Sequence, residues 1–185
     1  LLFLLAAGLL AGQVQAQDLP KPSPLSKVEQ VIGLTTIGIE YSRPSVKGRT
    51  IFGDLVPYDR DWRLGANACT KFTTSTEINI GGTDLKAGTY AVFAIPAESG
   101  GWKVLFNTDT EQWGAGSYDT AKDVATIDAK AVSNPFTETL TLGITDVTSE
   151  TAYFRIQWAD IRVDIPVAIK TREIAEANIQ AAIEK

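Results

Sequence analysis

The 185-residue chain contains no histidine, and this absence excludes several common kinds of enzyme. Nucleophile pairs in which a histidine activates serine or cysteine cannot form. Zinc sites with histidine ligands, and iron sites made of two histidines and one carboxylate, are excluded as well. Any catalysis would have to rely on carboxylates, lysine, tyrosine or serine. We therefore predict no metal, no cofactor and no catalytic residue, and a non-catalytic role is favoured.

Cysteine and methionine are also scarce, because Cys69 is the single cysteine and methionine is absent. One cysteine cannot form an internal disulfide, and a domain of this size can fold without one. Cys69 follows Ala66-Asn67-Ala68 and has no histidine partner in the chain. We therefore predict a small buried side chain here rather than a reactive thiol.

No apolar run reaches the roughly 20 residues that a transmembrane helix needs. The stretch from Leu1 to Gly12 is nonetheless apolar and uncharged, and a polar segment follows it. Such a short run before a small residue is typical of a secretory signal peptide. We predict a signal peptide over residues 1–16, cleaved after Ala16, with export to the periplasm or cell surface. No membrane insertion is expected after cleavage.

Positive charge is in the minority, with 17 Lys and Arg residues against 22 Asp and Glu residues and a net charge of −5. This balance disfavours nucleic acid, since neutralisation of phosphates supplies most of that affinity. It equally disfavours electrostatic attachment to anionic lipid. The partners that we expect are a glycan, a peptide or another protein of the cell envelope.

Short apolar and aromatic segments alternate with turn residues along most of the chain. About nine such segments at regular spacing, with no helical pattern between them, predict an all-β antiparallel sandwich, jelly-roll-like or barrel-like. The run Thr89–Ile95 is almost continuously apolar, as in a strand buried on both faces. The predicted strands begin near Lys27 and continue at Ile37–Tyr41, Thr70–Ile80, Thr89–Ile95, Trp102–Phe106, Val124–Val132, Phe136–Ile144, Thr151–Trp158 and Arg162–Val167.

The two ends of the mature chain have different patterns. Residues 17–26 contain three prolines and predict an extended tether before a sandwich domain at 27–168. Residues 169–185 have apolar and charged residues at helical spacing, which predicts a short C-terminal helix with Thr171 as its N-cap.

One long stretch between strands, residues 41–70, concentrates charged and aromatic side chains. Loops carry function more often than framework does, and mixtures of Arg, Asp and Trp suit polar ligands. The basic residues could hold a carboxylate or a phosphate, and the tryptophan could stack on a sugar. The alternative is that the Arg and Asp side chains pair with each other and lock the loop. The candidate ligand-binding residues are Arg43, Lys47, Arg49, Trp62, Arg63, Asn67 and Trp113.

A second loop, Asn107–Asp119, includes Trp113 and several oxygen-bearing side chains. Alternating oxygen ligands are typical of calcium loops, but the spacing lacks the glycine and glutamate of the EF-hand template. A turn-rich loop with Trp113 and Tyr118 exposed is the favoured interpretation.

Four motifs in these segments resemble one known family. They are RPSxKGRxIFG at Arg43–Gly53, WRxGAN at Trp62–Asn67, AGTYxxFxIP at Ala87–Pro96 and QWG at Gln112–Gly114. Over about residues 24–167 the chain is similar to the DUF2911 family of exported bacterial proteins, common in Bacteroidetes and without a settled function. The resemblance implies an extracytoplasmic, sandwich-like domain. It implies no reaction.

Three functions are compatible with these patterns. A non-catalytic binding module of the envelope predicts Trp62 or Trp113 exposed beside a groove. A hydrolase of glycan or cell-wall material predicts two facing carboxylates, one with a raised pKa, among Asp54, Asp59, Asp61, Asp109 and Glu111. A structural or assembly domain predicts a buried Trp62, loop charges paired internally and no pocket. We favour the binding module.

Overall fold

The computed structural model describes residues 19–114, 116 and 118–184. The predicted signal peptide at 1–16 lies outside these residues, and so does the beginning of the predicted tether. Within the described part of the chain, no helix combines the length and the apolarity that crossing a membrane would need.

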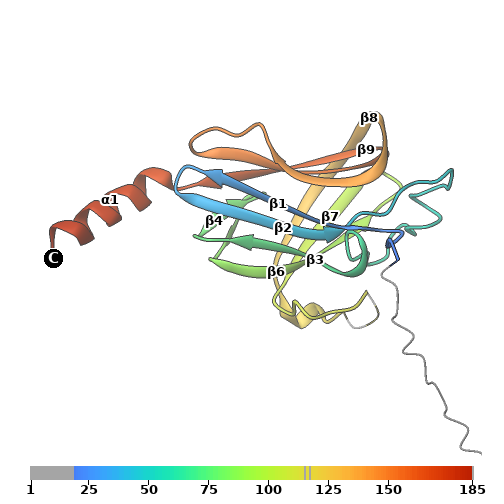
Figure 1. The fold of residues 1–185 in the computed structure, drawn as a ribbon, viewed down its shortest axis with the longest axis horizontal. Coiled ribbons are helices and arrows are strands. Elements are labelled where there is room, and N and C mark those ends of the chain that lie inside the picture. Colours follow the sequence, from blue (N-terminus) through green and yellow to red (C-terminus); the bar gives the residue numbers. More distant parts are fainter. Residues whose placement is uncertain (1–18, 115, 117, 185) are drawn as a thin grey trace, which may run out of the picture.

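The described residues form one antiparallel sheet of nine strands and a short C-terminal α-helix (Figure 1), which confirms the predicted all-β class. A single turn of 3₁₀-helix, η2, precedes the longest strand. The elements are β1 (Leu25–Ile32), β2 (Thr35–Ser42), β3 (Ala66–Thr74), β4 (Ile78–Ile80), β5 (Thr83–Leu85), β6 (Gly88–Pro96), β7 (Gly101–Asn107), η2 (Thr120–Lys122), β8 (Asp123–Thr145), β9 (Thr151–Ile169) and α1 (Thr171–Ile183).

The sheet folds over on itself at β8, so that two layers face each other. The strand order is β1-β2-β3-β6-β7-β8-β9-β4-β5. The first part of β8 pairs with β7, from Asp123 to Lys130, and the remainder pairs with β9. Figure 1 shows β8 and β9 lying across the layer that contains β1 and β2. The end strands β1 and β5 do not pair in the described structure, so the sandwich is not closed into a barrel.

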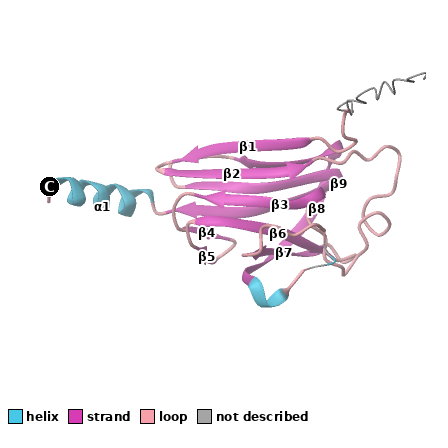
Figure 2. Cartoon of the chain, turned by 60° about the horizontal axis from the view of Figure 1, so that its bottom comes forward, coloured by secondary structure: helices cyan, strands magenta, loops and turns pink. Residues whose placement is uncertain are grey.

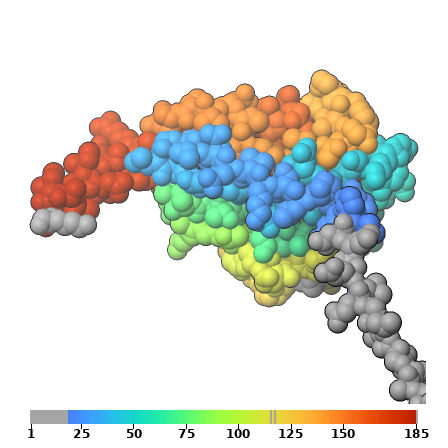
Figure 3. Space-filling view, viewed as in Figure 1, coloured from blue at the N-terminus to red at the C-terminus, as the bar shows by residue number. Residues whose placement is uncertain are grey.

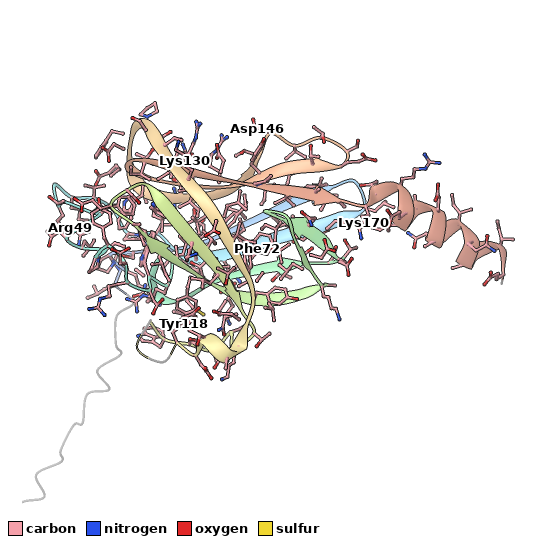
Figure 4. All side chains as sticks on the ribbon, turned by 180° about the vertical axis from the view of Figure 1, so that it is seen from behind. Arg49, Phe72, Tyr118, Lys130, Asp146 and Lys170 are labelled. Carbon is pink, nitrogen blue, oxygen red and sulfur yellow. The ribbon has the colours of Figure 1, made fainter. Side chains whose placement is uncertain are left out.

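The main core lies between the two layers and follows from the two-residue period of the strands. In β9, Ala152, Phe154 and Ile156 are buried, whereas Tyr153 between the first two is exposed. Phe72 of β3 lies in the interior (Figure 4), where its ring contacts Phe154 of the other layer at a centroid distance of 5.4 Å. Burying each such side chain contributes about 1.5–3 kcal/mol to the hydrophobic driving force.

A second, smaller core lies on the outer face of β3, β6 and β7. It contains Cys69, Ala91, Phe93 and Leu105, with Tyr118 of the following loop packed against it. This cluster buries β6 on both faces and so confirms the prediction for Thr89–Ile95. Cys69 is buried and free, as predicted, and burial raises the pKa of its thiol.

Individual strand bounds differ from the prediction, although the number of strands agrees. The segments Val124–Val132 and Phe136–Ile144 are one strand, β8, and the two last predicted strands are likewise one strand, β9. The β8–β9 register shifts between Ser133 and Thr137, so the chain bends at Asn134-Pro135 without ending the strand. Conversely, Thr70–Ile80 spans two strands, and β5 was not predicted.

The C-terminal helix α1 is present, but its predicted N-cap is wrong. Lys170 occupies the cap position without a side-chain hydrogen bond, and Thr171 instead donates from Oγ1 to the Ser149 carbonyl at 2.7 Å. None of the helix residues is buried, and Figures 2 and 3 show that α1 projects away from the sheet.

Candidate functional site

A cavity of about 300 Å³ lies among the turns that follow β2 and precede β3. Figure 4 places Arg49, on its wall, at the end of the molecule opposite α1. The segment before β1, the first residue of β3 and strand β9 supply the rest of the wall. The lining residues are Pro22, Ser23, Pro44, Ser45, Lys47, Arg49, Leu55, Val56, Trp62, Arg63, Gly65, Ala66 and Trp158.

The backbone of this segment is held in unusual conformations. Lys47, Asp59, Leu64 and Asn67 all have positive φ, between 50° and 59°, a region that residues other than glycine rarely adopt. Such residues cost roughly 1–3 kcal/mol each and persist where the surrounding structure enforces them, often at binding sites. Leu64 is completely buried, which fixes the turn between Trp62 and β3.

Two stacked tryptophans form the inner wall of the cavity. The rings of Trp62 and Trp158 lie 5.7 Å apart at an interplanar angle of 19°. Trp62 is attached to β6 by two backbone hydrogen bonds with Ala94, each 2.8 Å, and its Nε1 donates to the Gly65 carbonyl. The Nε1–H of Trp158 is buried and has no acceptor among the described residues. The wall is therefore rigid and apolar, and one of its donors is unpaired.

Three cationic side chains line the cavity: Lys47, Arg49 and Arg63. Arg49 donates from Nε to the Val46 carbonyl and from Nη2 to the Ser45 carbonyl, which orients its guanidinium while leaving other N–H groups for a ligand. Within the described structure, none of the three cations forms an ion pair, and no carboxylate lines the cavity.

The ion pairs of the described residues do not support the alternative in which the Arg and Asp side chains of residues 41–70 pair with each other. Among the described residues, Asp54, Asp59 and Asp61 form no ion pair with the neighbouring arginines or with any other cation. Three like charges around one cavity repel each other, and a bound anion relieves that repulsion. The cavity is therefore electrostatically suited to an anion, although the chain as a whole carries a net charge of −5.

Three of the predicted ligand-binding residues, Arg43, Asn67 and Trp113, lie outside the cavity lining. Arg43 joins the two layers, because it donates to the Leu140 carbonyl at 3.0 Å and to Thr141 Oγ1 at 2.9 Å. Asn67 donates to the Ser23 carbonyl and to Ser42 Oγ, which holds Ser23 on the cavity wall. Arg43 and Asn67 thus hold neighbouring segments in place without lining the cavity themselves.

Trp113, the remaining predicted residue, lies on the Asn107–Asp119 loop with 71% of its surface exposed. The loop reaches the cavity through the next residue, Gly114, whose backbone lies against the Arg63 guanidinium. Tyr118 was predicted to be exposed, but it is half-buried. Its ring packs on Phe93 and its hydroxyl donates to Asp123. The small outer core buries part of the Tyr118 ring, which the sequence of the loop does not indicate.

Two acids of this loop, Asp109 and Glu111, are engaged in ion pairs. Asp109 accepts a hydrogen bond from Lys122, and Glu111 accepts one from Lys71. These lysine contacts are the main reason that the pKa of each carboxyl is lowered. A general acid of a hydrolase needs a raised pKa, so the directions found for Asp109 and Glu111 do not favour that role.

Several wall residues were not predicted from the sequence. Pro22 and Ser23 belong to the proline-rich segment, where the Pro24 carbonyl accepts from the Arg43 amide at 2.9 Å. Trp158 was predicted only as the last residue of the strand Thr151–Trp158. No local signal assigns these residues to a site, because contact across the sandwich brings them together.

The comparisons with known proteins identify a family but no activity. The family model described as "Protein of unknown function (DUF2911)" matches residues 23–167. No curated protein and no solved structure matches the chain. The matched range covers both layers of the sheet and the complete cavity except Pro22. On this match over most of its length, the chain belongs to the DUF2911 family, as its motifs indicated.

Proposed function

We propose that this chain is a non-catalytic binding module of the bacterial cell envelope, and that its ligand is an anion held in the cationic cavity. The observation that carries the proposal is the set Lys47, Arg49 and Arg63, three cations on one cavity without a carboxylate among its lining residues. Arginine binds carboxylate and phosphate groups through paired, charge-assisted hydrogen bonds. The stacked Trp62 and Trp158 supply a rigid apolar wall for the remainder of the ligand.

The envelope location rests on the apolar segment Leu1–Gly12 and on the exported character that the family resemblance implies. A non-catalytic role is supported by the absence of histidine and by the lowered pKa values of Asp109 and Glu111. Preformed pockets with a few convergent polar groups are the usual sites for small ligands.

The test is a thermal-unfolding screen of the chain from Gln17 against inorganic phosphate, glucuronate, citrate and neutral glucose. An anion present at a hundredfold over its Kd should raise the free energy of unfolding by about 2.7 kcal/mol, a shift of several degrees in Tm. Glucose should give no shift. The absence of a shift with every anion would contradict the proposal.

Matched variants locate the site. Arg63→Gln and Lys47→Gln should each weaken anion binding by about tenfold or more, since a hydrogen bond to a charged group contributes about 1.5–3 kcal/mol. Lys130→Gln removes the same charge from an exposed position on β8 and should leave the affinity unchanged. Equal losses in all three variants would indicate a nonspecific charge effect.

A further inference from the structure

Among the described residues, Trp113 has the most exposed aromatic side chain. Its neighbour Gln112 is only 4% exposed and is held at both ends. The Gln112 carbonyl accepts from the Cys69 amide of β3 at 3.1 Å, and its side-chain nitrogen donates to Asn107 Oδ1 at 3.0 Å. The indole of Trp113 is therefore 71% exposed to solvent, while the residue before it is anchored to the sheet and to Asn107.

Gly114 connects this indole to the cavity. A methyl group at Gly114 would lie 2.5 Å from Nη1 of Arg63, so only a residue without a side chain allows this approach. The φ of +84° at Gly114 imposes the same requirement. Arg63 therefore lines the cavity and also has the backbone of Gly114 against its guanidinium.

The cavity and Trp113, which are linked by the contact of Gly114 with Arg63, offer two kinds of binding capacity. The cavity offers cations, and Trp113 offers a flat apolar face outside it. The ion pair between Glu111 and Lys71 makes the surroundings of Trp113 polar. A sugar ring suits such a place, because one of its faces is apolar while its rim carries hydroxyl groups. An apolar side chain of a peptide would instead need a pocket that buries it away from water.

We infer that the ligand is an acidic oligosaccharide, with the carboxylate of one sugar in the cavity and a neighbouring neutral sugar stacked on Trp113. This inference rests on the proposed anion site and assigns its ligand class. The cavity of about 300 Å³ accommodates one sugar unit, so the second unit lies outside it. A neutral second sugar also avoids repulsion from Glu111 and Asp109 on the same loop.

The experiment compares three probes by isothermal titration on the chain from Gln17: glucuronate, cellobiouronic acid (glucuronic acid linked to glucose) and neutral cellobiose. The acidic disaccharide should bind about tenfold more tightly than glucuronate, and cellobiose should show no binding. Trp113→Ala should reduce the disaccharide to the affinity of glucuronate and leave glucuronate itself unchanged. Tyr153→Ala, which removes an aromatic side chain that is 40% exposed on β9 and does not line the cavity, should change none of these values.

The outcomes separate this inference from the proposed function. Equal affinities for glucuronate and cellobiouronic acid, or a disaccharide affinity unaffected by Trp113→Ala, would overturn the inference. The anion site would still stand if Arg63→Gln weakened glucuronate binding by about tenfold or more. A Glu-Phe dipeptide that binds more tightly than glucuronate and depends on Trp113 would overturn the inference in favour of an acidic peptide. No binding by glucuronate, citrate or phosphate would refute the anion site itself.

Discussion

Tyr41 shows how a single polar group can join the two layers of the sandwich. Its side chain is only 2% exposed. The hydroxyl donates to the Leu142 carbonyl at 3.3 Å and accepts from the Leu142 amide at 2.9 Å. Tyr41 of β2 thereby satisfies both backbone groups of one residue of β8, in the opposite layer.

Replacing Tyr41 with phenylalanine should destabilise the domain by about 1–3 kcal/mol, because the Leu142 amide and carbonyl lose their shared partner in a buried place. Urea unfolding at neutral pH measures this change. Tyr153→Phe is the matched control, since Tyr153 is 40% exposed and should tolerate the change. An equal effect in the two variants would show that the interlayer hydrogen bonds contribute no stability.

At the scale of single residues, the sequence identified side chains that can bind a polar ligand, but not which of them lie in the cavity. The predicted set did include Lys47, Arg49, Trp62 and Arg63, which share the cavity. It also included Arg43, which braces the layers instead. Arginines that bind ligands and arginines that bind backbone carbonyls have the same local sequence signal, because the difference lies in which distant atoms surround them.

At the scale of elements, the Asn107–Asp119 loop and η2 are held against the sheet by a charged network. The Tyr118 hydroxyl donates to Asp123, and Lys122 pairs with Asp109. Burial, and then the hydrogen bond to the Asp123 carboxylate, raise the pKa of Tyr118 well above its ordinary value. The loop is therefore anchored while Tyr118 keeps its proton.

This anchoring should depend on pH in the alkaline range. The folded-state pKa of Tyr118 is raised, so its stabilising contribution is complete below the unfolded pKa of about 10 and is lost as pH rises above that value. Tyr118→Phe should be less stable than the wild type by about 1 kcal/mol at pH 7. The difference in the free energy of unfolding should shrink above about pH 10.

Urea titrations of both proteins across this range provide the measurement. The wild type and the variant share every other tyrosine and lysine, so their difference isolates Tyr118. A difference that stays constant up to about pH 11 would show that Tyr118 titrates alike in the folded and unfolded chains.

Strand identity was easier to predict than strand extent. Alternation within five to nine residues identifies the buried face of a strand, because successive side chains point to opposite sides. It does not show whether β8 continues past Asn134-Pro135, since a bulged strand and a turn share the same residues. Pairing with β9 decides that point. Similarly, the Thr171 side chain bonds to Ser149 rather than capping α1, because a distant carbonyl lies within its reach.

At the scale of the whole molecule, an acidic protein carries a cationic cavity. The net charge of −5 weakens long-range attraction of an anion, whereas Lys47, Arg49 and Arg63 attract it at short range. Glucuronate affinity should therefore fall several-fold between about 0.1 M and about 1 M salt, over which the screening length falls from about 10 Å to about 3 Å.

Titrations of the wild type and of Arg63→Gln over this range of salt test the point. The variant has one cation fewer at the site, so its salt dependence should be weaker. A salt-independent affinity in the wild type would mean that ionic contacts do not hold the ligand.

The amino-acid sequence by itself determined the all-β class, the antiparallel strands with their buried faces, and the family. Each depends on residue patterns within a short stretch of chain or on motifs read directly. Tertiary structure alone decided the cavity, whose wall combines Ser23, Trp62 and Trp158. Folding of the sheet at β8 brings these residues together, and no local pattern encodes which distant side chains meet when the two layers bury their apolar faces.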